Sequence, residues 1–220
     1  MTMRRICAYC GDSNPATRDH VPPRCVFTKP LPKNLITVPA CHPCHQRFSV
    51  TDDDFCAMLS TRISEDSGPA ITEWRLKRAR GIRGSAGRRG NWRQQRELLR
   101  HVAHVLNRSK EGGLLPYSKT VLWNADSHDR TLIRVTRALY FRQFSEILPL
   151  SVSIHVLVIR EFSQQINDTF QNADTLEIGG GQFVCRYLKD DSHPFLSLWL
   201  YEFHGKHRGI AGTNIAAETP

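Results

Sequence analysis

Residues 7–45 read CAYCGDSNPATRDHVPPRCVFTKPLPKNLITVPACHPCH, and the rest of the chain is expected to be organised around this segment. It contains two Cys-x-x-Cys pairs, Cys7 with Cys10 and Cys41 with Cys44. Each pair presents two sulfur atoms from one tight turn, and two such turns facing each other complete a tetrahedral zinc site. We therefore expect a structural Zn²⁺ with four cysteine ligands. The alternative is that the four cysteines are reduced residues of the core. That alternative does not readily explain why they form two Cys-x-x-Cys pairs.

The loop between the two pairs carries side chains suited to metal-assisted hydrolysis of a phosphodiester. Asp19 offers a hard oxygen ligand, and His45 offers an imidazole ligand, for a divalent ion. His20 has an ordinary pKa of about 6.5, so it can accept a proton at cellular pH. Asn34 can fix a backbone segment or an imidazole ring by hydrogen bonds without adding charge.

In the order CAYC, RDHVPP, KNLITV and CHPCH, this stretch resembles the zinc-containing subtype of the HNH endonuclease family, which has a ββα-metal motif. The resemblance covers about the first fifth to quarter of the chain. It implies that Asp19 and His45 hold a catalytic Mg²⁺ or Mn²⁺, that His20 is the general base, and that Asn34 holds the loop or orients His20. The products would carry a 5′-phosphate and a 3′-hydroxyl. Family members commonly have Asn in place of His45, and an imidazole there admits Ni²⁺ or Zn²⁺ as well.

Composition narrows the class of protein. A chain of 220 residues with 40% hydrophobic content forms one large domain or two small ones. No apolar run is long enough to span a membrane, and the N-terminal residues lack the apolar segment of a signal peptide, so we expect a cytoplasmic protein. Seven cysteines fit metal binding in a reducing compartment better than a disulfide scaffold, so Cys25, Cys56 and Cys185 are expected to be free, buried thiols.

The formal charge of +9 is concentrated in residues 75–100, which hold ten Lys or Arg and one acid. Such a stretch favours a polyanionic partner, because each neutralised phosphate releases condensed counterions. A solvated basic linker is the alternative. The sequence thus predicts a nucleic-acid partner, and the resemblance to HNH endonucleases implies that it is DNA. The side chains expected to contact phosphates are Arg18, Arg24, Arg47, Arg78, Arg80, Arg83, Arg88 and Arg89, with Lys33 as a further flanking charge.

The hydrophobic patterns predict an α+β fold, with the zinc-clasped ββα-metal unit followed by helices and a mainly antiparallel C-terminal sheet. We expect a nuclease domain over residues 1–66, a glycine-rich basic linker over 67–90 and an α+β domain over 91–220. Expected strands are 18–21, 35–38, a strand with alternating residues from Val152 to Val158, 183–187 and a central 195–203 strand. Expected helices begin at Cys44, at a capping box of Thr51 and Asp54, at Asn91 (to about Arg108) and at Asp129 (to Ile147).

Other interpretations stay open. A non-catalytic zinc-ribbon protein that binds nucleic acid, an RNA-directed nuclease, and a protein-interaction module working through the C-terminal region all fit parts of the pattern. The pairs His101 with His104 and His204 with His207 are expected to be structural. Gly179 to Gly181 is expected to be a hairpin loop. Phage defence, maintenance of a mobile element and repair would each suit a nuclease of this size.

Overall fold

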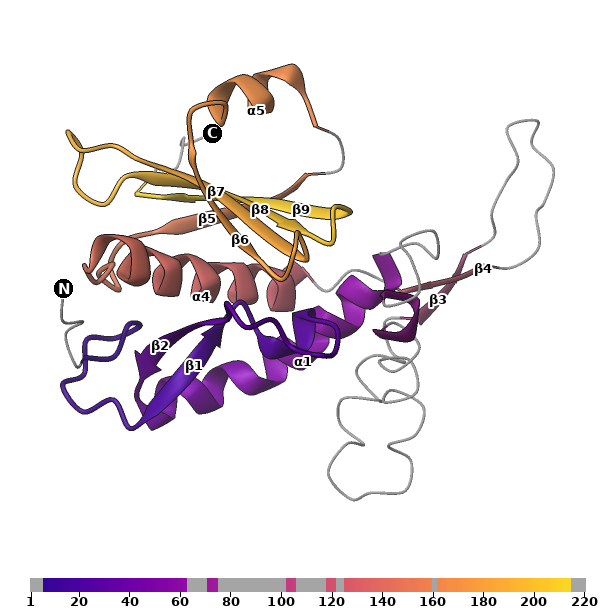
Figure 1. Cartoon of the computed structure of the whole chain (residues 1–220), viewed down its shortest axis with the longest axis horizontal. Helices are drawn as coiled ribbons and strands as arrows, with labels where there is room; N and C mark the ends of the chain where they lie inside the picture. The colour runs from indigo at the N-terminus through magenta and orange to yellow at the C-terminus, as the bar shows by residue number, and fades with distance from the viewer. Residues whose placement is uncertain are drawn as a thin grey trace.

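The computed structural model describes residues 6–62, 71–74, 102–105, 118–121, 125–159 and 162–214. The fold is mixed helix and strand, with an antiparallel C-terminal sheet. Figure 1 shows three layers, in which helix α4 (Ala125–Phe144) lies between the C-terminal sheet and an N-terminal unit of a hairpin and a helix. The described helices include none that is both long and apolar enough to cross a membrane.

The N-terminal unit has the predicted order of two strands and a helix. Strands β1 (Thr17–Val21) and β2 (Ile36–Ala40) pair antiparallel, with Asp19 opposite Val38. A short 3₁₀ helix, η1 (Arg24–Val26), lies in the connection between the strands. Both strands match the expected ones within two residues. The inward-facing positions of this hairpin are buried, because the pleat sends alternate side chains toward the helices.

Helix α1 (His42–Arg62) follows β2 directly and corrects one prediction. We expected two helices here, with Thr51 capping the second. Instead the helix continues through Thr51, whose hydroxyl donates to the carbonyl of Phe48 at 2.9 Å. A threonine inside a helix can donate its hydroxyl proton to a carbonyl of the preceding turn. Thr51 is therefore accommodated within α1 and does not start a new helix.

The C-terminal sheet has the strand order β5-β9-β8-β7-β6, and every neighbouring pair is antiparallel. The central position of β8 is confirmed: Trp199, Tyr201 and Phe203 on this strand are fully buried. Gly179 to Gly181 form the turn between β6 and β7 with positive φ angles, as a hairpin loop requires. The elements are β5 (Ile154–Ile159), α5 (Gln164–Thr169), β6 (Asp174–Ile178), β7 (Phe183–Lys189), β8 (Ser197–Phe203) and β9 (His207–Thr213).

A separate antiparallel pair, β3 (Val102–Val105) with β4 (Ser118–Val121), overturns part of the predicted helix from Asn91 to Arg108. A short apolar run fits a helical stripe and a strand equally well, and pairing with a later strand decides between them. The rest of that predicted helix lies outside the described residues. The helix predicted from Asp129 is confirmed as α4, which begins earlier and ends at Phe144.

Helix α4 joins the two outer layers, because it buries side chains on both sides. The hydroxyl oxygen of Thr136 lies 2.7 Å from the hydroxyl oxygen of Tyr201 in the sheet. Arg134 donates to Asp19 of the hairpin. Buried apolar residues of the N-terminal unit, α4 and the sheet form one cluster. The predicted domain boundaries stay a prediction, since most of the 67–90 linker lies outside the described residues; within it, Trp74 is buried and donates to the carbonyl of Cys25.

The prediction that Cys25 and Cys56 are free thiols is wrong. They form a disulfide, with Cα atoms 6.0 Å apart, that links η1 to α1. The two cysteines are 31 residues apart, and the sequence alone does not indicate that η1 packs against this helix. Disulfides are rare in reducing compartments, so the cysteine usage no longer supports the expected cytoplasmic location. Cys185 is a free, buried thiol as expected.

Candidate metal centre

The four cysteines of the two Cys-x-x-Cys pairs come together. The sulfur atoms of Cys7, Cys10, Cys41 and Cys44 all lie within 4.8 Å of one another, and those of Cys10 and Cys41 are 3.7 Å apart. Tetrahedral zinc, with Zn–S distances of about 2.3 Å, places its sulfur ligands about 3.8 Å apart. The set can therefore hold a structural zinc ion. It offers no open position for water or phosphate when all four sulfur atoms bind.

Backbone hydrogen bonds hold the two cysteine turns together. The amide of Gly11 donates to the carbonyl of Cys7 at 2.9 Å, in a turn that Gly11 permits with a φ of +79°. The amide of Ala8 donates to the carbonyl of Pro39 at 2.9 Å, which ties the first turn to the end of β2 beside Cys41. Burial raises the pKa of Cys7, but backbone hydrogen bonds, chiefly from Cys41, bring it below its ordinary value overall.

Asp19 on β1 and His45 in the first turn of α1 face each other. Asp19 Oδ1 lies 4.0 Å from His45 Nε2, and the aspartate side chain is almost fully buried. Small divalent ions bind oxygen and nitrogen ligands at about 2.1 Å. A cation between these two atoms can therefore contact both of them, and the half-exposed His45 leaves one side of the position open to solvent.

Hydrogen bonding assigns the tautomer of His45. The hydroxyl of Thr17 donates its one proton to the carbonyl of Ala40 at 2.9 Å. His45 Nδ1 lies 3.1 Å from the same hydroxyl oxygen, so Nδ1 carries the proton and donates it. In the neutral ring, Nε2 then presents a lone pair toward a carboxylate oxygen. Two electron-pair donors facing each other in this way suit a cation, and a histidine ligand commonly has its other nitrogen bonded like this.

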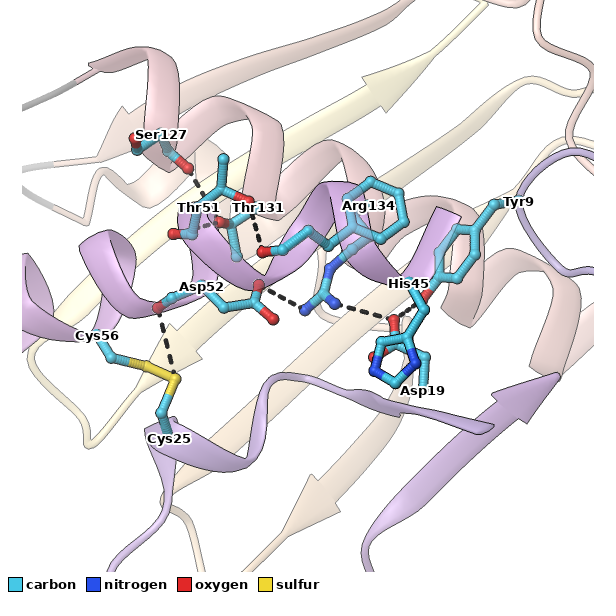
Figure 2. Close-up of polar contacts among 11 residues, drawn as sticks. Tyr9, Asp19, Cys25, His45, Thr51, Asp52, Cys56, Ser127, Thr131 and Arg134 are labelled. Atoms are coloured by element: carbon cyan, nitrogen blue, oxygen red, sulfur yellow. Dashed lines mark hydrogen bonds and ion pairs between the residues drawn. A yellow bond between two sulfur atoms is a disulfide. The ribbon is translucent and has the colours of Figure 1, made fainter. Parts of the chain in front are cut away.

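The other oxygen of Asp19 is fully engaged. Asp19 Oδ2 accepts from the hydroxyl of Tyr9, and from Arg134 Nη1 of α4 at 2.9 Å. On its far side, Arg134 Nη2 lies 2.8 Å from Asp52 Oδ1 of α1. Figure 2 shows the guanidinium group between the two carboxylates, with Tyr9 and His45 beyond Asp19. Burial raises the pKa of Tyr9 well above its ordinary value, so its hydroxyl stays a donor.

His20 follows Asp19 on β1 and is half-buried. Burial, followed by the positive charge of Arg24, lowers the pKa of His20. The charges of Asp19 and His45 also act on the ring. A neutral imidazole is therefore favoured near neutral pH, the form in which histidine can accept a proton. The role of His20 as general base stays a prediction.

Asn34 contacts the C-terminal sheet through its side chain. Its side-chain amide donates to the carbonyl of Glu177 at 3.0 Å and its oxygen accepts from the amide of Gly179 at 3.3 Å. Both partners belong to the end of β6 and the turn after it. Asn34 thus connects the loop before β2 to the C-terminal sheet, which is the kind of contact a loop-holding residue makes. Whether catalysis depends on it stays a prediction.

Three of the arginines expected to contact phosphate, Arg18, Arg24 and Arg47, are exposed on the N-terminal unit. The Nε atom of Arg18 donates to the hydroxyl of Thr37 at 2.9 Å, so this side chain lies along β2. Lys33 is also exposed, as is His42 within the second cysteine turn. The other five expected contacts, Arg78, Arg80, Arg83, Arg88 and Arg89, lie outside the described residues.

The C-terminal histidine pair is buried in the core. His204 donates from Nε2 to the carbonyl of Val26 at 2.8 Å, and His207 Nε2 lies 3.1 Å from His128 Nε2. These contacts agree with the expected structural role of His204 and His207. His101 lies outside the described residues, and only the backbone of His104 is described.

No family model, curated protein or solved structure matches the chain. The resemblance to HNH endonucleases therefore stays an expectation from the sequence motifs.

Sequence reasoning missed Tyr9, Asp52 and Arg134. Tyr9 lies between Cys7 and Cys10, and nothing in the spacing of the cysteines indicates a role for it. Arg134 stands among apolar residues in a helix, as LIRVTRALY shows, and a charged residue in such a run commonly has a buried partner. That pattern could have singled out Arg134. Its partner Asp19 lies 115 residues away, a separation that the sequence alone cannot bridge.

The buried Asp52 predicts a pH dependence of stability. Burial raises its pKa from an ordinary 3.8 to about 7, although Arg134 opposes the shift. Between these values the folded chain binds more protons than the unfolded chain, so the free energy of unfolding falls as the pH rises through this range. From pH 5 to pH 8 we expect the wild type to lose about 2 to 3 kcal/mol more than Asp52→Asn. Denaturant unfolding at both pH values measures this; equal losses would contradict it.

Proposed function

We propose that the chain is a metal-dependent HNH-type endonuclease that hydrolyses phosphodiester bonds of DNA. The observation that carries this proposal is the approach of Asp19 Oδ1 and His45 Nε2 to 4.0 Å. These atoms come from the first strand and the helix of a ββα unit, next to four clustered cysteines. The hydrogen bond to Thr17 turns the lone pair of His45 toward the carboxylate, as a cation requires.

In this proposal each residue has a separate task. Asp19 and His45 hold the divalent ion, Mg²⁺ or Mn²⁺ with Ni²⁺ or Zn²⁺ as alternatives, while the cysteine-bound Zn²⁺ fixes the fold. The divalent ion would supply charge stabilisation for the phosphate and the leaving oxygen. His20 accepts the proton of the attacking water, and Asn34 holds the loop before β2 against the sheet. Reaction products would carry a 5′-phosphate and a 3′-hydroxyl.

The proposed substrate is DNA contacted mainly through its phosphates. Arg18, Arg24 and Arg47 offer exposed guanidinium groups on the N-terminal unit. The charge of residues 75–100 adds a polyanion-binding stretch. Contacts of this kind position a duplex without reading its sequence, so we expect little sequence preference. The same chemistry would accept RNA, which the assay below compares directly.

Incubation of the zinc-loaded chain with supercoiled plasmid, and separately with RNA, tests the proposal. Each substrate is offered with Mg²⁺, with Mn²⁺, with Ni²⁺ or with no added metal. We expect nicked plasmid only where a divalent ion is added, and loss of nicking when EDTA is added before the reaction is started. Intact plasmid under every condition, from protein that holds one zinc per chain, would contradict the proposal. Cleavage of RNA alone would move the substrate to RNA.

A second candidate function is a zinc-containing protein that binds nucleic acid without cutting it. It is favoured by one observation, the buried ion pair between Asp19 and Arg134, which already balances the charge of the carboxylate. Under this alternative the chain retards plasmid in a gel-shift assay at low salt and leaves it uncut with every metal. The plasmid assay therefore separates the two candidates.

A further inference from the structure

Arg134 is a buried cation shared between two carboxylates. Its side chain is 1% exposed, with Nη1 at 2.9 Å from Asp19 Oδ2 and Nη2 at 2.8 Å from Asp52 Oδ1. Its guanidinium carbon also lies 5.1 Å from the centre of the Phe48 ring on α1. The guanidinium group is hydrogen-bonded to Asp19 and ion-paired with Asp52, and a buried planar cation held on two sides has little rotational freedom. The arginine is therefore held in one orientation.

This arrangement determines which way the Asp19 carboxylate turns. Arg134 and the hydroxyl of Tyr9 both bond to Oδ2, so Oδ1 is the oxygen left to face His45 Nε2. Without Arg134, the carboxylate of Asp19 is free to rotate about its Cβ–Cγ bond. Either oxygen can then face His45. Hydrogen bonds to the non-ligating atoms of a metal ligand commonly fix its direction in this way.

The second carboxylate keeps the charge suitable for a cation. Arg134 alone would cancel the charge of Asp19 and repel a divalent ion placed beside it. At pH 8, where Asp52 is ionised, the three side chains together carry a net charge of −1, which attracts a cation. Asp52 acts through the arginine, since it lies on the far side of the guanidinium group from Asp19 (Figure 2).

We propose that Arg134 is a positioning residue for the metal ligand Asp19, that Asp52 balances its charge, and that the C-terminal half of the chain thereby completes the site. The inference rests on the proposed function, because it needs a divalent ion at Asp19 and His45. It also assigns a role to α4, which the N-terminal motif does not contain. The motif alone would then be an incomplete site.

Mn²⁺ binding to the zinc-loaded chain at pH 8, followed by electron paramagnetic resonance, tests this inference without any cleavage assay. The variants are Arg134→Lys, which keeps the charge but loses the fork, and Asp52→Asn, which keeps the shape but loses the charge. We expect each to bind Mn²⁺ roughly tenfold or more weakly than the wild type, with one zinc per chain retained. The matched control is Arg130→Lys, one turn earlier on α4, where Arg130 is exposed and paired with Asp126.

The outcomes separate this inference from the proposed function. A wild type that binds Mn²⁺ and nicks plasmid, with both variants folded and binding Mn²⁺ as tightly, would overturn the positioning role alone. A wild type that binds no Mn²⁺ would overturn both proposals. A purely structural role would lower the melting temperature of the variants and leave the Mn²⁺ affinity of the folded fraction unchanged. If Arg134→Lys does not fold, Asp52→Asn decides the matter by the same comparison.

Discussion

Replacing His20 by alanine is expected to lower the rate of plasmid cleavage by about 10²–10⁴-fold, because this is the usual contribution of a positioned general base. The substitution removes a half-buried ring from β1 and leaves Asp19, His45 and the cysteines in place. Zinc content, Mn²⁺ affinity and retention of DNA in a gel-shift assay should therefore stay close to those of the wild type. Initial rates of nicking under saturating Mg²⁺ measure the effect.

A matched control for this variant is His155→Ala. His155 is exposed on β5, an edge strand of the C-terminal sheet, and no part of the proposed site includes it. The control should cleave at the wild-type rate. If His20→Ala cleaves as fast as the control, His20 is not the general base. If it loses DNA affinity in proportion to the rate, its role is in binding.

The second large effect is expected from Cys41→Ser, which removes one of the four sulfur ligands. A structural zinc contributes much of the folding free energy of a small unit, so its loss should cost on the order of 5 kcal/mol or more. Cys41 is also buried where β2 leads into α1, so loss of the zinc should disturb Asp19 and His45 together. Elemental analysis for zinc, followed by thermal unfolding, measures both consequences.

Cys185→Ala provides the control for the cysteine variant. Cys185 is a free, fully buried thiol on β7, away from the four clustered sulfur atoms. This variant should keep one zinc per chain and lose only the packing of one sulfur atom. A Cys41→Ser protein with full zinc content and wild-type melting temperature would show that the cysteine cluster is not a structural metal site.

Local patterns predicted the elements that depend on neighbouring residues. The two cysteine pairs, the hairpin strands around Asp19 and Val38, and the apolar β8 strand could all be inferred from spacing and alternation. Each of these signals arises within a few residues of the chain. The expectation that four cysteines come together succeeded because two turns of this kind have few other ways to satisfy their sulfur atoms.

The failures concern contacts between distant segments. The disulfide of Cys25 and Cys56 depends on η1 packing against α1, and the strand at Val102 depends on a partner that begins at Ser118. The ion pairs of Arg134 also join distant segments, because its carboxylate partners come from β1 and α1. No local pattern encodes such pairings, and each is decided by which surfaces become buried together. The clustering of the four cysteines was thus predictable, whereas the partners of Arg134 were not.

We propose a cation site between Asp19 and His45, beside the four clustered cysteines. Crystals of the zinc-loaded chain soaked in Mn²⁺, with diffraction recorded on both sides of the manganese absorption edge, test it most directly. We expect an anomalous peak about 2.1 to 2.3 Å from both Asp19 Oδ1 and His45 Nε2. Manganese bound elsewhere, or no peak between these two atoms in well-ordered crystals, would contradict it.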